Sequence, residues 1–135
     1  MTKNKLSFDS VIAKFKLAKI QLPQMLSNDG QKFYLDNFNK QGFQDSMFTP
    51  WRPRKNRSNT RALLVKTGAL RRAVSQSKYQ ATFDKITWRV GGLKYAVFHN
   101  TGTDRLPQRK FLGDSYALRL LLKRKIDKQI LLCFK

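Results

Sequence analysis

The fold is decided by the stretch Leu63–Val74, which reads LLVKTGALRRAV. Thr67 is placed to cap a short helix that Ala69 and Leu70 then continue, because threonine is a preferred N-cap residue. Gly68 would permit close approach of a neighbouring backbone. A basic helix start of this kind can also bind a phosphate, but the stretch lacks the spacing and the lysine of a nucleotide-binding loop. We therefore expect this helix to have a packing role.

A β-hairpin is predicted after the short helix. The run 75–83 and the alternating run Ile86–Val90 both read as strands, and Asp84-Lys85 would connect them. An isolated hairpin is only marginally stable in water, so its apolar face needs a helix or further strands against it.

The end of the chain carries the clearest helical pattern. After a short apolar run, Tyr95–His99, and a turn at Asn100–Gly102, we expect a third strand at Phe111–Gly113. Ser115 or Asp114 is then placed to cap a long amphipathic helix. The apolar residues of this helix recur on one stripe: Leu118, Leu121, Leu122, Ile126, Ile130 and Cys133.

The beginning of the chain also has helical periodicity. Apolar side chains recur at steps of three and four residues over 7–22, with lysines between them. Pro23 lacks an amide proton and disfavours helix at the residue before it, so we expect the helix to end or kink there. A second helical piece would follow, carrying Phe33, Tyr34 and Phe38.

Residues 41–61 predict a long basic loop. Gly, Pro, Asn and Ser are frequent there and no apolar period is present. Loops of this length are usually functional or disordered. Trp51 is the exception, and we interpret it as an anchor that pins the loop to the core rather than as a ligand platform, because an indole buries a large area.

Composition indicates one folded domain with a strong positive charge. The chain has 135 residues, of which 41% are hydrophobic, so it can bury a real core. Its 28 lysines and arginines stand against eight acidic residues, all aspartate, which gives a formal net charge of +20. Such a surplus is most easily tolerated beside a polyanion or an acidic partner surface. The positive charge therefore indicates a class of partner, but it does not indicate an activity.

The sequence offers little for targeting or for disulfide chemistry. The single cysteine, Cys133, excludes an internal disulfide and fits a reducing compartment. We find no apolar run of signal-peptide length and none approaching the roughly 20 residues that span a bilayer. We therefore expect a soluble protein that is not exported through a signal peptide and does not contact a membrane.

Candidate reactive groups are few. His99 is the sole histidine, and a lone histidine beside a turn is usually a hydrogen-bonded structural residue. One histidine and one cysteine cannot supply a zinc site, and no aspartates have calcium-loop spacing. We therefore expect no enzyme, no catalytic residue, no metal and no cofactor.

Nucleic-acid binding is the competing interpretation. Basic residues interleaved with aromatic ones suit phosphate contacts and base stacking, yet no helix-turn-helix, zinc-finger or RNA-recognition signature is present. The same charges could form a solvated face or meet acidic patches on partner subunits. The candidate basic residues that would face DNA or a partner are Arg52, Arg54, Lys55, Arg57, Arg61, Arg71, Arg72, Arg105 and Lys110.

Four segments in this order resemble the tail-completion, or virion morphogenesis, family of contractile-tailed bacteriophages. They are Trp51–Pro53, Leu63–Arg72, Tyr95–Gly102 and Pro107–Ser115. The resemblance covers about residues 47 to 117. Two positions depart from the family pattern, because Lys110 stands where a second proline is usual and Ala73 where a serine is common.

The resemblance implies a structural protein of the virion. It would complete the tail or join the tail to the head at the neck, as one wedge of a homo-oligomeric ring among other tail or neck proteins. Assembly would take place in the bacterial host cytoplasm. The family is not known for enzymatic activity. The resemblance gives scaffold roles to the motif residues Trp51, Thr67, Gly68, Leu70, Tyr95, His99, Gly102, Arg109, Phe111, Leu112 and Gly113.

Together these patterns predict a single α+β domain over 1–135. Its parts would be an N-terminal helical region (1–40), the basic loop (41–61) and a motif-bearing α+β core (62–135) with a hairpin, a third strand and the C-terminal helix. The expected function is phage morphogenesis, and the alternative is a basic nucleic-acid-binding accessory protein without catalytic activity.

Overall fold

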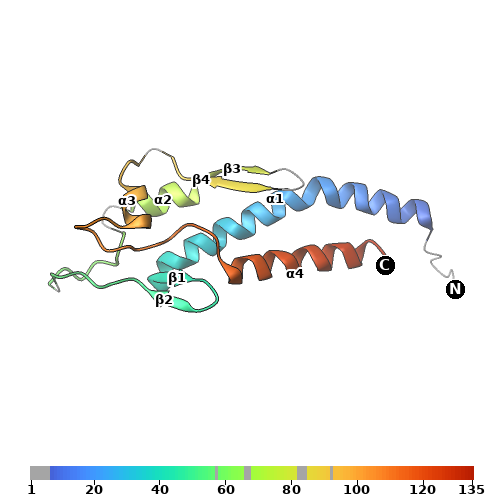
Figure 1. Cartoon of the computed structure of the whole chain (residues 1–135). Helices are drawn as coiled ribbons and strands as arrows, with labels where there is room; N and C mark the ends of the chain where they lie inside the picture. The colour runs from blue at the N-terminus through green and yellow to red at the C-terminus, as the bar shows by residue number, and fades with distance from the viewer. Residues whose placement is uncertain (1–6, 57, 66–67, 82–84, 92) are drawn as a thin grey trace.

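The computed structural model describes residues 7–56, 58–65, 68–81, 85–91 and 93–135. This part of the chain has four helices and two separate two-stranded antiparallel sheets, which confirms the α+β class (Figure 1). The elements in chain order are α1 (Phe8–Lys40), β1 (Gly42–Gln44), β2 (Phe48–Pro50), α2 (Ala69–Ser75), β3 (Lys78–Ala81), β4 (Ile86–Arg89), α3 (Ala96–Thr101) and α4 (Tyr116–Leu132).

Helix α1 is one continuous helix of 33 residues, so of the two outcomes expected at Pro23, an end or a kink, the end was wrong. Ser7 caps its start by accepting a hydrogen bond from the Ser10 amide. A proline in a helix interior costs about 3 kcal/mol, but the following turns from Leu26 to Phe38 are held by burial in the core. Tertiary packing therefore outweighs the local preference to end the helix.

Helix α4 lies antiparallel beside α1 (Figure 1), and its predicted place in the sequence is confirmed. Lys125 forms an ion pair with Asp29 at 3.1 Å. Near the chain ends, the rings of Phe15 and Phe134 meet edge to face at 5.6 Å. The paired ends of the two helices, residues 8–25 and 124–135, form an extension that we call the helical arm.

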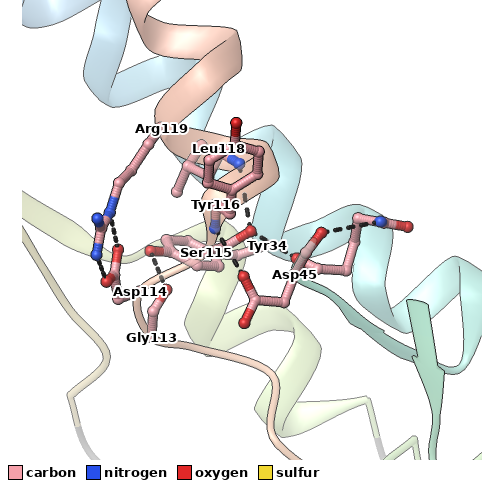
Figure 2. Close-up of polar contacts among 9 residues, drawn as sticks. Tyr34, Asp45, Gly113, Asp114, Ser115, Tyr116, Leu118 and Arg119 are labelled. Atoms are coloured by element: carbon pink, nitrogen blue, oxygen red, sulfur yellow. Dashed lines mark hydrogen bonds and ion pairs between the residues drawn. The ribbon is translucent and has the colours of Figure 1, made fainter. Parts of the chain in front are cut away.

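The start of α4 is fixed by contacts with the β1–β2 hairpin (Figure 2). The hydroxyl of Ser115 caps the helix by accepting from the Leu118 amide and donates to the Gln44 carbonyl at 2.6 Å. The carboxylate of Asp45 accepts a hydrogen bond from the Tyr116 amide at 2.7 Å, which lowers the pKa of this carboxyl group. These bonds join α4 to the β1–β2 hairpin.

The β3–β4 hairpin packs on α1 through Trp88. The Trp88 indole donates to the Ser27 carbonyl at 2.9 Å, and its ring meets Tyr34 edge to face at 5.5 Å. Gly30 makes room for this ring, because a Cβ there would lie 2.2 Å from Trp88. The hairpin was predicted, although β3 starts later than expected because Ser75 still belongs to α2. Its connection at 82–84 lies outside the described residues.

The second sheet, β1–β2, was not predicted, since 41–61 had been expected to be loop throughout. Conversely, the third strand expected at Phe111–Gly113 is absent, although this segment is described. The amides of Phe111 and Leu112 instead donate to the side-chain oxygen of Asn100, at 2.9 and 3.1 Å. A side chain therefore takes the donors that a sheet would need.

The core lies where α2, α3 and the segment before α4 meet the C-terminal half of α1. Its buried members are Tyr34, Phe38, Trp51, Leu70, Val74, Ala96, Phe111 and Leu118. None of the helices in the described ranges has the length and apolar character needed to cross a bilayer.

Candidate functional site

A pocket of about 540 Å³ opens beside α2 and α3. We call it the Arg109 pocket. It gathers five residues that the sequence had marked as candidate site residues, together with Leu64 and Ala69, which it had not marked in this way. The lining residues are Arg54, Leu64, Ala69, Leu70, Tyr95, His99 and Arg109. Leu64 adopts a left-handed backbone conformation with φ of 60°, which sequence periodicity does not reveal.

Arg109 is the central cation of this pocket and is only 8% exposed. Its Nε donates to the Arg52 carbonyl at 2.9 Å, and its backbone amide donates to the His99 carbonyl at 2.8 Å. Within the described residues, neither Nη atom of Arg109 has a hydrogen-bond or ion-pair partner. Burial lowers the pKa of this guanidinium, and the neighbouring charges of Arg54 and Arg52 lower it further.

Arg54 also lines the pocket, but its donors are already engaged. One Nη atom donates to the Arg61 carbonyl and the other to the Ala62 carbonyl at 3.0 Å. These bonds tie the segment around Arg54 to residues 61 and 62, close to Leu64 on the pocket lining. Arg54 therefore combines a structural role in the loop with a positive charge at the pocket.

His99 lies on α3 beside the edge of the Tyr95 ring, with 5.9 Å between the ring centroids. Its Nδ1 is buried and has no hydrogen-bond partner within the described residues. Burial lowers the pKa of the imidazole and the charge of Arg109 lowers it further, so His99 is neutral at pH 7. None of the described residues that line the pocket is acidic, so no carboxylate among them orients His99 as a base.

The other motif residues are held in the scaffold. Trp51 is buried, and its indole donates to the Lys110 carbonyl at 2.8 Å, which confirms its interpretation as an anchor. Phe111 is buried in the core and Leu112 packs against it. Gly113 accepts a hydrogen bond from the Tyr34 hydroxyl at 3.0 Å.

Two glycines of the motifs have backbone conformations that favour glycine. Gly102 ends α3 with φ of 76°, and a Cβ there would lie 2.9 Å from the Gln108 amide nitrogen. Gly68 precedes α2 with φ of 74°. The cap predicted at Thr67 and the basic residue Arg57 lie outside the described residues.

The remaining basic residues do not converge on one point. Arg71 donates to the Asn39 side chain at 2.9 Å, and the Lys110 ammonium lies 4.7 Å from the centroid of the Phe43 ring. Arg72 lines a second pocket of about 510 Å³ together with Lys78 and Arg89. The rest of the predicted basic set is exposed on the surface: Arg52, Lys55, Arg61 and Arg105.

Asn100 is the important residue that sequence reasoning did not single out. Its side chain holds the segment that carries Arg109 against α3, through the two amides that follow Lys110. The only signal in the sequence was its place in an Asn-Thr-Gly turn, which is common to many loops.

Metal-binding groups are sparse in the described structure. Across the described ranges, no three His, Cys, Asp or Glu side chains lie close enough together to hold a metal ion. Cys133 is buried, and its Sγ lies 3.3 Å from the Gln129 carbonyl oxygen, as for a small core residue at a helix end.

The chain matches no protein-family model, no curated protein and no solved structure.

Proposed function

We propose that this chain is a structural phage morphogenesis protein that completes the tail or joins the tail to the head at the neck. The observation that carries the proposal is the way in which the resembling segments interlock. Trp51 from the first segment bonds to Lys110 from the last one, and His99 from the third bonds to Arg109. These contacts hold the four segments in one scaffold, as is expected of a building block.

The helical arm gives a second line of support. Phe8 and Ile20 are 79% and 76% exposed, and Leu17, Leu131 and Phe134 are also largely exposed. Exposed large apolar side chains are common on surfaces that meet another protein. Apolar side chains offer nothing to a phosphate backbone, so these residues suit a protein partner.

The proposed mechanism is assembly without bond chemistry. Each copy would act as one wedge of a ring, in which one face of a subunit meets a different face of its neighbour. In that arrangement the basic surface would face either acidic partner subunits or DNA that passes through the ring. The proposed site of action is the virion, with assembly in the bacterial host cytoplasm.

The proposal is tested by removing the gene from the phage or prophage that carries it. Negative-stain electron microscopy of the particles should then show filled heads and free tails that do not join, and the gene supplied from a plasmid should restore joining. Normally joined particles without the gene would contradict the proposal. So would a locus that holds no portal, tail-tube or tail-sheath genes beside it.

The alternative is a nucleic-acid-binding accessory protein. It is favoured by the second pocket, which Arg72, Lys78 and Arg89 line together. Binding through phosphate contacts falls steeply with salt, with a slope of about 0.9 per contact on logarithmic axes.

The two functions are separated by neutralising exposed charges. The triple variant Arg52→Gln, Lys55→Gln and Arg61→Gln keeps the backbone carbonyls of the loop and removes three positive charges. A DNA-binding protein should lose about two to three units of salt slope in a fluorescence anisotropy titration. A purely structural role predicts weak DNA binding in the parent protein and little change in the variant.

A further inference from the structure

We propose that the Arg109 pocket binds a carboxylate carried by a partner polypeptide. This inference concerns a binding site rather than a place in the particle, and it does not rest on the assembly role. It is argued from the burial of Arg109, from the donors that are already engaged around it and from the apolar lining of the pocket.

The first step is the unpaired charge. Arg109 is nine-tenths buried, and within the described residues no carboxylate pairs with it. Arg52 and Arg54 add positive charge beside it. Burying a cation without a counter-charge is costly, so an anion that entered the pocket would gain a strong and little-screened attraction. Arginine also offers a planar fork that suits a carboxylate bound through both oxygens.

The second step is the number of free donors. The two Nη atoms of Arg54 already donate to backbone carbonyls, whereas both Nη atoms of Arg109 lack partners within the described residues. One open guanidinium fork matches the two oxygens of a carboxylate. A phosphate monoester presents three oxygens and would leave at least one of them without a donor from this fork.

The third step is the apolar part of the lining. The side chains of Leu64, Ala69 and Leu70 are apolar, and Tyr95 adds an aromatic ring. A nucleic-acid strand carries a sugar on each side of every phosphate and needs a polar groove that follows its backbone. A carboxylate on a short aliphatic or aromatic stem fits these surroundings, as in a glutamate flanked by apolar residues or at a peptide's carboxyl end.

The test uses the full-length protein and a matched pair of small probes. The probes are 3-phenylpropionate and its neutral amide, which have nearly the same shape. Binding is followed by NMR through the His99 ring and the Arg109 Nε–H signal. We expect saturable binding of the acid, with the amide at least about tenfold weaker because it lacks the charge-assisted bonds. The bound anion should also raise the pKa of His99, because it would offset the positive charge of Arg109 beside the imidazole.

Two variants locate the binding, and a third controls for charge. Arg109→Lys keeps the positive charge but loses the planar fork, and it should weaken binding of the acid by about tenfold. Ala69→Leu fills the pocket without touching a charge and should block binding even if Arg109→Lys fails to fold. Lys55→Gln removes one exposed charge that does not line the pocket and should leave binding unchanged.

Two peptides then identify the source of the carboxylate. One is a capped pentapeptide with a central glutamate between leucines, and the other is an acetylated tripeptide that ends in a free leucine carboxylate. Saturable binding of either peptide, lost in Ala69→Leu, supports the proposal and names the source.

The proposal is overturned by any of three results. The first is equal binding of acid and amide, which would make the pocket merely apolar. The second is tighter binding of inorganic phosphate or a short oligonucleotide at the same ring signals. The third is no binding of the acid at millimolar concentration.

Discussion

The indole Nε1 of Trp51 donates a hydrogen bond to the backbone carbonyl of Lys110 at 2.8 Å, although 59 residues separate the two in the chain. The same indole meets the Phe38 ring edge to face at 5.5 Å. One side chain thereby joins the loop after β2, helix α1 and the segment that carries Arg109. The position of that segment, and of the pocket beside it, depends on this anchor.

Replacement of Trp51 should therefore destabilise the whole domain. Trp51→Phe keeps an aromatic ring but removes the donor to Lys110, and should lower the free energy of unfolding by about 1–3 kcal/mol. Trp51→Ala also opens a cavity, and should cost about 3–5 kcal/mol. Urea unfolding followed by circular dichroism measures both. Met47→Ala, at a residue 78% exposed, is the control and should change stability by less than about 0.5 kcal/mol. Equal effects of all three variants would refute the anchor role.

Gly30 should not tolerate a methyl group, although alanine is the better helix former by about 1 kcal/mol. A Cβ at this position would lie 2.2 Å from the Trp88 ring, so the β3–β4 hairpin must shift. We expect Gly30→Ala to destabilise by about 1–3 kcal/mol in thermal unfolding, as for an overpacked core. Gly91→Ala is the matched control, because its Cβ would meet no atom within 4 Å, and it should be neutral or slightly stabilising. A stabilised Gly30→Ala protein would show that Trp88 does not pack there.

The long-range features of this fold could be predicted only where one strong local signal decided them. Helix α4 has a serine cap and an apolar stripe, and its start at Tyr116 followed from Ser115. Trp51 was interpreted as an anchor because an indole buries a large area, and it is buried in the structure. The β3–β4 hairpin followed from alternation around Trp88.

Other features depend on contacts that no local pattern encodes. The continuity of α1 through Pro23 reflects burial of the turns that follow it. The strands β1 and β2 have three residues each, and their apolar and polar residues do not alternate. Gly42 is needed in β1 because a Cβ there would lie 2.3 Å from the Phe48 ring. The Arg109 pocket forms only when the fold brings Arg54 and Arg109 together. Nothing in the local sequence around either residue indicates that the other lies nearby.

Acidification should destabilise the protein through His99. The pKa of His99 in the folded chain lies below its ordinary value of 6.5. Below pH 6.5 the unfolded chain therefore binds a proton that the folded chain does not yet bind. The free energy of unfolding should fall as the pH falls from 7 toward the lowered folded pKa, and no further below it.

Urea unfolding at several pH values between 7.5 and 5 measures this effect, with His99→Gln as the comparison. The variant should lose the dependence in this window. The pKa of the Asp45 carboxyl is lowered below its ordinary value of 3.8. Its contribution is therefore present above pH 3.8, is lost as the pH falls through the lowered folded pKa, and does not overlap the His99 window. If the free energy of unfolding changed with pH by the same slope in the parent protein and in His99→Gln, His99 would be ruled out as the cause of that slope.

A charge on the helical arm should stop assembly and leave the fold intact. Ile20 is 76% exposed on α1, so Ile20→Asp removes apolar contact surface with little effect on the core. We expect this variant to melt within a few degrees of the parent protein but to fail in restoring joined particles when the gene has been deleted. Gln21→Asp introduces the same side chain at the next exposed position and should restore joining. Full activity of Ile20→Asp would exclude this part of the arm as a contact surface.

The central claim is that this protein is a stoichiometric part of a virus particle. Quantitative mass spectrometry of gradient-purified particles, before and after nuclease treatment, measures it most directly. The account predicts a fixed number of copies per tail that nuclease does not release. Particles free of this chain, or particles that lose it when their accessible DNA is digested, would contradict the account.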